Sequence, residues 1–183
     1  MDNKFKKAFY LEKCDKGYHG YHNYYNEIIG DARVESIMEI GVAWGDSLKA
    51  WQRIWPEAKI EALDLFRAYD LSLEKRFRIY NIDSTNKDKT DLIDKTYDVI
   101  VDDGEHDWNT QLKTFYNFYD KAKKFYVIED IKGVRSLDLL LKNLPLTDNE
   151  RFQIFVSHGH QRVFDVDGHS EKDSYRIMFI DKR

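Results

Sequence analysis

Five short apolar runs alternate with longer stretches whose apolar residues recur every three or four positions, and this alternation strongly constrains the fold. The runs contain much Ile, Val and Tyr between polar flanks, which is typical of buried parallel strands. They cover residues 36–41, 59–65, 77–83, 97–103 and 125–130. Three helical stripes begin at Trp44, Trp108 and Val134, and each would face a sheet. Because parallel neighbours need crossover connections, the pattern predicts an α/β fold with a doubly wound parallel sheet and helices on both faces.

The two ends of the sequence depart from this alternation. Residues 151–157 and 174–181 are strand-like with no helical stripe between them, so they predict a terminal antiparallel pair that closes the sheet. The loop between them is long and polar, and it holds His158, His160 and His169. The spacing of these histidines is poor for zinc and favours a solvated loop. Residues 1–33 predict an N-terminal segment of one or two helices with an aromatic core stripe.

Length and composition are typical of one globular domain over residues 1–183. The 29 Lys and Arg against 33 Asp and Glu give a net charge of −4, which argues against a nucleic-acid partner. The single cysteine, Cys14, excludes an internal disulfide and a thiolate zinc site. No stretch approaches the ~18 apolar residues of a membrane helix, and the N-terminus has no apolar signal region, so we expect a cytoplasmic protein.

A glycine-containing turn follows the first predicted strand. Glu39, Gly41, Gly45 and Ser47 form an E-x-G-x-x-x-G-x-S pattern that runs directly into a helical stripe. Glycines at such a turn let the backbone approach a ligand, and the helix N-terminus offers free N–H groups. The pattern differs from the G-x-G-x-x-G of dinucleotide-binding proteins. It resembles motif I of class I S-adenosylmethionine (SAM) methyltransferases, whose glycine loop holds the methionine moiety; a tight turn without a ligand is the alternative.

Single acidic residues follow the second and third predicted strands. Asp64 is placed to accept hydrogen bonds from both ribose hydroxyls of a bound nucleoside. Asp83 stands where methyltransferases of this class often carry an acidic residue near the adenine amine. The alternative for either carboxylate is to cap a helix that follows.

Two acidic clusters end the fourth and fifth predicted strands. Asp102 and Asp103 precede His106, and Glu129 and Asp130 end the next run. If the two strands are neighbours, their ends lie about 4.8 Å apart, and four carboxylates crowd the edge where open α/β sheets bind ligands. A hard divalent cation such as Mg²⁺ relieves this repulsion through oxygen ligands. A solvated acidic rim is the alternative, and the apolar strands before both clusters disfavour it.

Taken together, these motifs resemble the family of macrolide-sugar O-methyltransferases (the macrocin and mycinamicin enzymes) and the related cephalosporin-pathway and rhamnosyl O-methyltransferase-like proteins. The hallmarks run in order through residues 16–25, 39–51, 102–106 and 127–130. Two features depart from the family. Glu105 replaces a small hydroxylated residue, and the sequence shows no counterpart of the long N-terminal auxiliary domain, so we expect the substrate and the assembly to differ.

The resemblance implies a Rossmann-like class I methyltransferase that transfers a methyl group from SAM to a hydroxyl of a sugar or a glycosylated small molecule. In such enzymes the acids that bind Mg²⁺ match Asp103, Glu129 and Asp130, and the general base matches His106. The implied cofactor-binding residues are Glu39, Gly41, Gly45, Ser47, Asp64, Asp83 and Asp102. With an ordinary pKa near 6.5, a neutral histidine can accept the hydroxyl proton.

Two other functions compete with this interpretation. An NAD-dependent oxidoreductase is disfavoured by the lack of G-x-G-x-x-G and by the closing antiparallel pair. A non-catalytic SAM-binding module is disfavoured by the intact His106 and the acidic clusters. The expected partner is a small-molecule or saccharide acceptor, and the sequence is compatible with either a monomer or an oligomer.

Overall fold

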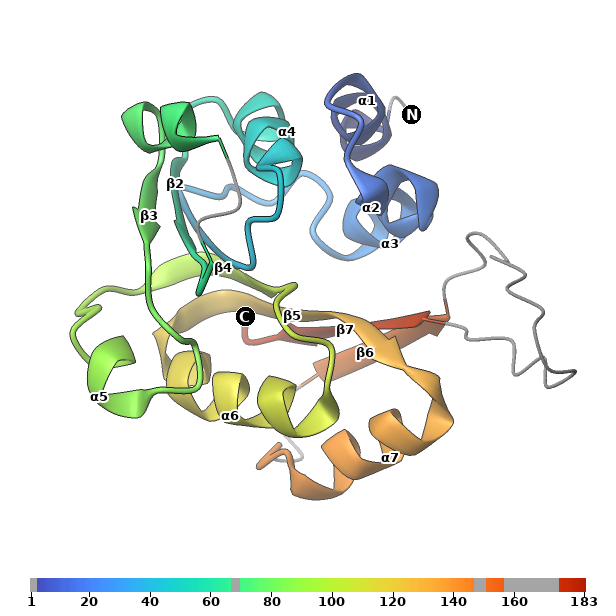
Figure 1. Cartoon of the computed structure of the whole chain (residues 1–183). Helices are drawn as coiled ribbons and strands as arrows, with labels where there is room; N and C mark the ends of the chain where they lie inside the picture. Colours follow the sequence, from blue (N-terminus) through green and yellow to red (C-terminus); the bar gives the residue numbers. More distant parts are fainter. Residues whose placement is uncertain (1–2, 67–69, 147–150, 157–174) are drawn as a thin grey trace, which may run out of the picture.

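The computed structural model describes residues 3–66, 70–146, 151–156 and 175–183, which one seven-stranded sheet organises (Figure 1). The strand order is β3-β2-β1-β4-β5-β7-β6. The strands are β1 (Ser36–Ile40), β2 (Lys59–Leu63), β3 (Arg78–Tyr80), β4 (Tyr97–Asp102), β5 (Ala122–Lys132), β6 (Arg151–Val156) and β7 (Tyr175–Asp181). The first five pair in parallel, whereas β7 lies antiparallel between β5 and β6.

Helices cover both faces of this sheet (Figure 1). One layer holds α1 (Lys4–Leu11), α2 (Asp15–Tyr18), α3 (Tyr21–Ile28) and α4 (Asp46–Ile54). The opposite layer holds α5 (Lys87–Thr90), α6 (Trp108–Phe118) and α7 (Gly133–Asn143). Two short 3₁₀ helices, η1 (Leu71–Lys75) and η2 (Tyr119–Lys121), complete the described elements. The predicted parallel sheet with helices on both faces and a closing antiparallel pair is therefore confirmed.

Alternating strand residues divide the core into two halves. Along β4, Val99 and Val101 pack toward the α1–α4 layer, while Ile100 packs toward α6 and α7. The same alternation occurs in β5, where Val127 and Ile128 belong to opposite halves. Both halves are apolar, because helices cover both faces of the sheet and successive strand residues are buried on alternate faces. The direction of a side chain at a strand end is therefore set by its place in this alternation.

Several predicted boundaries shift in the structure. The helix predicted to begin at Trp44 begins at Asp46, because Ala43 and Gly45 have positive φ angles of 46° and 77°, which a helix does not allow. The third predicted strand, residues 77–83, shortens to the three residues of β3. The N-terminal segment contains three helices rather than one or two. Val134, predicted to face the sheet, is exposed.

Some predictions fall on residues outside the described part of the chain. These are the loop histidines His158, His160 and His169, and one end residue of each closing strand, Ser157 and Ser174. Among the helices of the described residues, none has the length and apolar character that crossing a membrane requires.

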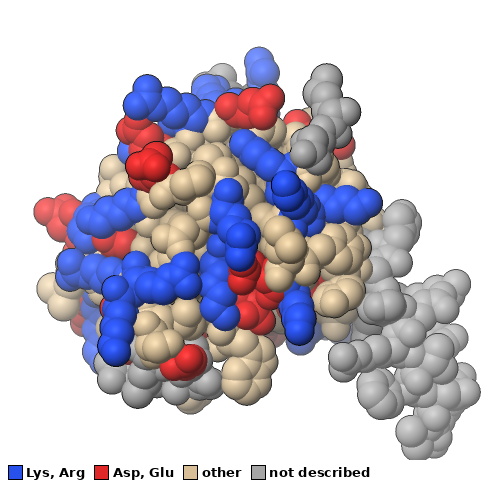
Figure 2. Space-filling view, turned by 90° about the horizontal axis from the view of Figure 1, so that it is seen from above, with Lys and Arg blue, Asp and Glu red and all other residues tan. Residues whose placement is uncertain are grey.

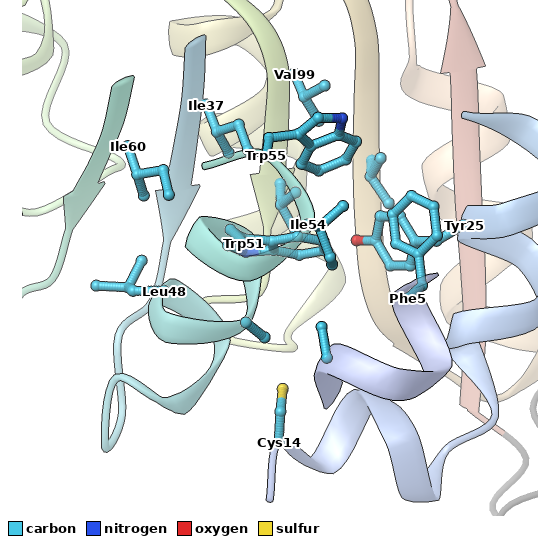
Figure 3. Close-up of a cluster of buried hydrophobic side chains, with 14 of the residues drawn as sticks. Phe5, Cys14, Tyr25, Ile37, Leu48, Trp51, Ile54, Trp55, Ile60 and Val99 are labelled. Atoms are coloured by element: carbon cyan, nitrogen blue, oxygen red, sulfur yellow. The ribbon is translucent and has the colours of Figure 1, made fainter. Parts of the chain in front are cut away.

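Aromatic side chains tie the N-terminal helices to the sheet (Figure 3). Trp51 of α4 is 1% exposed and meets the rings of Phe9 and Tyr25 edge-on, with centroid distances of 5.1 Å in both pairs. Phe5 of α1 packs edge-on against Trp55 at 5.4 Å. Such pairs add stabilisation to the burial of large apolar surfaces. Trp44, in contrast, is 73% exposed, so its predicted place in the core is wrong.

Replacing Trp51 with alanine should destabilise the protein by about 3–5 kcal/mol, because it removes a large side chain from the centre of this cluster. Trp44→Ala is the matched control and should change the free energy of unfolding by no more than about 0.5 kcal/mol. Urea denaturation followed by far-UV circular dichroism measures both values. Equal effects of the two substitutions would contradict this assignment of the core.

Candidate functional site

The candidate site lies where the carboxyl ends of β1, β4 and β5 meet beneath α2 and α3. Because the three strands are parallel neighbours, Ile40 pairs with Asp102 and Asp102 pairs with Ile128. The residues next to Ile40, Asp102 and Ile128 therefore lie at the same edge of the sheet. This is the edge at which open α/β sheets bind ligands.

A buried lysine from α2 stands at the centre of the acidic residues. The Lys16 ammonium lies 2.5 Å from Asp103 Oδ2, 2.7 Å from Glu129 Oε2 and 3.4 Å from Glu39 Oε1, and its side chain is 1% exposed. Burial alone would lower the pKa of Lys16, but the three carboxylates together raise it well above its usual value. The ammonium in turn holds the pKa of Asp103 at about 2, against the opposing effect of burial. Lys16 is therefore a fixed positive charge.

Strand alternation decides which acidic residues join Lys16. Asp103 and Glu39 face the α1–α4 layer, whereas Asp102 faces the opposite half of the core, where burial raises its pKa to about 8. The expected group of four carboxylates thus forms with Glu39 in the place of Asp102. Glu39 also accepts a hydrogen bond of 2.7 Å from the Ser47 hydroxyl, and burial raises its pKa to about 7.

A β-bulge brings Glu129 and Asp130 to the same side. The pairing of β5 with β7 shifts register between Ile128 and Ile131, and Asp130 has a φ angle of 53°, which is unusual for a residue other than glycine. In a regular strand the two neighbours would point to opposite faces. The bulge instead turns both toward α3, which is a common use of bulges near functional sites.

Two tyrosines of α3 hold these carboxylates. The Tyr25 hydroxyl donates to Glu129 Oε1, and the Tyr21 hydroxyl donates to Asp130 Oδ1 at 2.5 Å. His19 Nδ1 lies 3.5 Å from the same Asp130 oxygen, and a hydrogen bond with that carboxylate raises the pKa of His19. For these tyrosines the sequence favoured core packing over a lid above a substrate. Its buried hydroxyl groups, which need partners, were the missed signal.

His106 lies in the loop between β4 and α6 and contacts two of the acidic residues of the candidate site. Its Nε2 lies 3.4 Å from Asp103 Oδ1 and 3.9 Å from Asp130 Oδ2. This nitrogen is buried and has no hydrogen-bond partner among the described residues. Burial lowers the pKa of His106, but the Asp103 carboxylate outweighs it and the net shift is upward. One ligand atom from each of Asp103, His106 and Asp130 lies within 4.8 Å of the others, a spacing that suits a bound cation.

The loop that carries His106 is anchored at its end. Asp107 Oδ1 accepts hydrogen bonds from the backbone N–H groups of Asn109 and Thr110, at 3.0 and 3.3 Å, and so forms the N-cap of α6. An aspartate at this position satisfies free N–H groups of the first helical turn. It fixes the start of α6 directly after the histidine.

The glycine turn packs closely against the end of β4. Gly41 has a φ angle of +92°, and a Cβ at this position would lie 2.1 Å from the backbone oxygen of Asp103. Asp64, one residue beyond β2, accepts hydrogen bonds of 2.7 Å from the N–H groups of Val42 and Phe66. The turn, Asp64 and the end of β4 therefore form one connected structure in which Gly41 tolerates no side chain.

Asp83 forms local hydrogen bonds, but it does not cap the helix that follows, because the N-cap of α5 is Asn86. Its Oδ1 accepts from the Thr85 backbone N–H at 2.8 Å and from the Thr85 hydroxyl at 2.7 Å. This structure does not bring Asp83 into the Lys16 cluster. Its predicted contact with an adenine ring stays a prediction.

Charged side chains are unevenly distributed over the surface. Figure 2 shows many Lys and Arg side chains, with acidic side chains among them, on the face seen from above the view of Figure 1. The net charge of −4 therefore does not describe this face. The acidic residues of the candidate site, in contrast, are largely buried.

Comparisons with known proteins place this fold. No protein-family model matches the chain, and a search of curated proteins finds no match. Among solved structures, the MycE methyltransferase from the mycinamycin biosynthetic pathway in complex with Mg and SAH (S-adenosylhomocysteine) is similar over all of this chain and 54% of that chain, with 20% identity and a TM-score of 0.66. A second crystal form of MycE, with Mg and SAH, gives 22% identity over 71% of this chain and 40% of that chain, at a TM-score of 0.57. The chain thus spans about half of MycE or less.

Shorter enzymes match over nearly their whole length. The O-methyltransferase TomG from Streptomyces achromogenes, in complex with SAM, covers 99% of this chain and 90% of its own, with 12% identity and a TM-score of 0.61. An O-methyltransferase from Bacillus cereus in complex with SAH covers 100% and 92%, with 11% identity and a TM-score of 0.58. The chain therefore has the Rossmann-like fold of class I SAM-dependent methyltransferases.

The buried Asp102 makes a prediction about stability and pH. Its pKa of about 8 lies far above the ~3.9 of an exposed aspartate, so the folded state retains a proton that the unfolded state releases. This contribution to stability is complete below pH 4 and is lost as the pH rises through 8. Between these values the free energy of unfolding should fall by about 1.4 kcal/mol per pH unit because of this residue.

Asp102→Asn should remove that contribution. Urea denaturation between pH 5 and 8 should show the stability of the variant rising relative to the wild type with each unit of pH. The other titrating groups act in both proteins, so the difference isolates Asp102. Parallel pH profiles would show that Asp102 is ionised in the folded protein.

Proposed function

We propose that this protein is a SAM-dependent O-methyltransferase that acts, with Mg²⁺, on a hydroxyl of a sugar or a glycosylated small molecule. The observation that carries the proposal is the convergence of Asp103, His106 and Asp130 at the ligand-binding edge of a methyltransferase fold. MycE, which shares this fold, has been solved with Mg, SAH and mycinamycin VI. The sugar acceptor is proposed from the motif resemblance and from this likeness.

The glycine turn and the acidic residue after β2 fit a nucleoside-containing donor. Gly41 and Gly45 both have positive φ angles, so no Cβ covers the backbone of the turn. The Asp64 carboxylate is already oriented beside the turn by the N–H groups of Val42 and Phe66. We propose that Asp64 binds the ribose hydroxyls and that Asp83 lies near the adenine end. Glu39 and Ser47 would fix the turn through their shared hydrogen bond.

The carboxylates of Asp103 and Asp130 fit a divalent cation. Each has one oxygen directed toward His106 Nε2, and this nitrogen is buried without a hydrogen-bond partner among the described residues. Mg²⁺ is commonly bound by one or two carboxylates together with its substrate and water. When bound, such an ion lowers the pKa of an acceptor hydroxyl. The role of the chain is to orient the acceptor and to remove its proton.

His106 is the proposed proton acceptor. It is within 4 Å of both carboxylates and follows β4 directly, so an acceptor held at the sheet edge would lie beside its Nε2. Neutral imidazole would take the proton as the acceptor oxygen bonds to the methyl carbon, while the methyl–sulfur bond of SAM breaks and SAH leaves. Because Asp103 raises the pKa of His106, the protonated fraction at neutral pH is increased, and turnover should rise as the pH increases above 6.5.

Isothermal titration calorimetry with SAM, SAH and NAD tests the proposed cofactor class. The wild-type protein should bind SAM and SAH and should not bind NAD. Asp64→Ala should weaken SAM binding by about 1.5–3 kcal/mol, because it removes hydrogen bonds to a charged group. Asp91→Ala, at an exposed aspartate that pairs with Lys87, is the control and should leave SAM affinity unchanged. A folded Asp64→Ala variant with wild-type affinity would remove Asp64 from the cofactor site.

Replacing His106 with alanine should lower turnover by about 10²–10⁴-fold and leave SAM affinity nearly intact, since the base does not hold the donor. Turnover is measured as SAH release with a panel of glycosides, using the one that responds best with the wild type. The variant should also lose the rise in turnover between pH 6 and 8. Normal turnover in the variant would show that another group accepts the proton.

A further inference from the structure

Lys16 already contacts carboxylate oxygens at the edge of the sheet where the proposed function requires a metal ion. The motif resemblance implies Asp103, Glu129 and Asp130 as the metal ligands. Lys16 touches two of them and is almost completely buried. An ammonium and a divalent cation repel each other strongly in a low-dielectric interior, so they cannot both sit close to one carboxylate oxygen.

We propose that Lys16 withholds Glu129 from the metal ion, so that Asp103 and Asp130 are the two carboxylate ligands of the site. This inference rests on the proposed function, because it concerns the same ion. It departs from the ligand set that the motif resemblance implies, in which Glu129 also binds the metal. Lys16 and Tyr21 thereby become positioning residues, because Lys16 holds Asp103 and Tyr21 holds Asp130.

Both oxygens of Glu129 are already engaged. Oε2 accepts from the Lys16 ammonium at 2.7 Å, and Oε1 accepts from the Tyr25 hydroxyl. The Glu129 side chain is 1% exposed, so neither contact can be exchanged for water. A metal ion bound to Oε2 would lie beside the Lys16 ammonium, and one bound to Oε1 would crowd the buried Tyr25 hydroxyl; both arrangements are costly.

Asp103 and Asp130 are arranged differently, because each has one oxygen tied and one oxygen directed to a common point. Asp103 Oδ2 binds Lys16, which leaves Oδ1 facing His106 Nε2 at 3.4 Å. Asp130 Oδ1 binds Tyr21, which leaves Oδ2 facing the same nitrogen at 3.9 Å. The contacts that hold the tied oxygens fix the direction of the remaining ones. Two carboxylates suffice for Mg²⁺, which completes its octahedron with water and substrate.

Binding of Mn²⁺ to the purified protein, followed by electron paramagnetic resonance without any acceptor, tests this division directly. Asp130→Asn should weaken Mn²⁺ binding at least about tenfold, since even partners of metal ligands contribute this much. Glu129→Gln keeps the shape of the side chain and, because Glu129 is not a ligand in this assignment, should change the dissociation constant far less than Asp130→Asn does. Equal weakening by the two substitutions would overturn the inference, and so would a wild type that binds no Mn²⁺.

The matched control is Glu61→Gln. Glu61 is also buried and paired with a lysine, at 2.8 Å from the Lys95 ammonium, so it reports the loss of a buried negative charge elsewhere. Its Mn²⁺ affinity should equal that of the wild type. A drop as large as that of Asp130→Asn would show that the assay responds to total charge, which would overturn the ligand assignment.

A second pair of variants tests Lys16 itself. In Lys16→Met, Glu129 loses its charged partner and should become a ligand, which tightens Mn²⁺ binding by about tenfold. Adding Glu129→Gln to that variant should abolish the gain, whereas the same substitution is silent when Lys16 is present. An equal effect of Glu129→Gln in both backgrounds would overturn the inference. If Lys16→Met does not fold, the Glu129→Gln and Asp130→Asn comparison decides alone.

Failure of this inference is distinguishable from failure of the proposed function. SAM binding by each variant is measured separately by calorimetry. A protein that binds Mn²⁺ through Asp130 but binds no SAM would contradict the proposed function and retain the ligand assignment. A protein that binds SAM but loses Mn²⁺ binding with Glu129→Gln would contradict the ligand assignment and retain the proposed function.

Discussion

A buried positive charge is the interaction on which the rest of the candidate site depends. Glu39, Asp103 and Glu129 come from three different strands and would repel one another at the sheet edge without a cation. Lys16 supplies that cation from a four-residue helix that has little stability of its own. Because removing one partner of a buried ion pair leaves an uncompensated charge, α2 and the strand ends stabilise each other.

The second constraint is the departure from regular strand geometry in β5. A period of two would place Glu129 and Asp130 on opposite faces, and the site would lose one of them. The bulge and the positive φ angle of Asp130 cost local backbone energy. The hydroxyl groups of Tyr21 and Tyr25, together with the β5–β7 pairing on both sides of the bulge, hold this geometry. The strained backbone of Asp130 thus lies within the candidate site.

The sheet was predictable from the sequence because hydrophobic periodicity reports directly on a local property of each element. The glycine turn, Asp64 and the His106 loop were predictable for the same reason, since each follows a recognisable strand. Trp44 was placed wrongly because periodicity cannot detect the two left-handed residues that delay α4. Lys16 was missed as the central cation because its partners lie 87 and 113 residues away, and no local pattern reports such a pairing.

The same α3 tyrosines serve both the core and the site, and this dual role links stability to geometry. The ring of Tyr25 packs edge-on against Phe9 and Trp51, while its hydroxyl holds Glu129. A change in the packing of the N-terminal helices therefore moves a hydroxyl that orients a buried carboxylate. Glu129 shares Lys16 with Asp103, and Asp103 in turn faces His106. Glu129, Lys16 and Asp103 thus connect the aromatic core to the proposed base. The packing of the N-terminal helices therefore affects the position of His106.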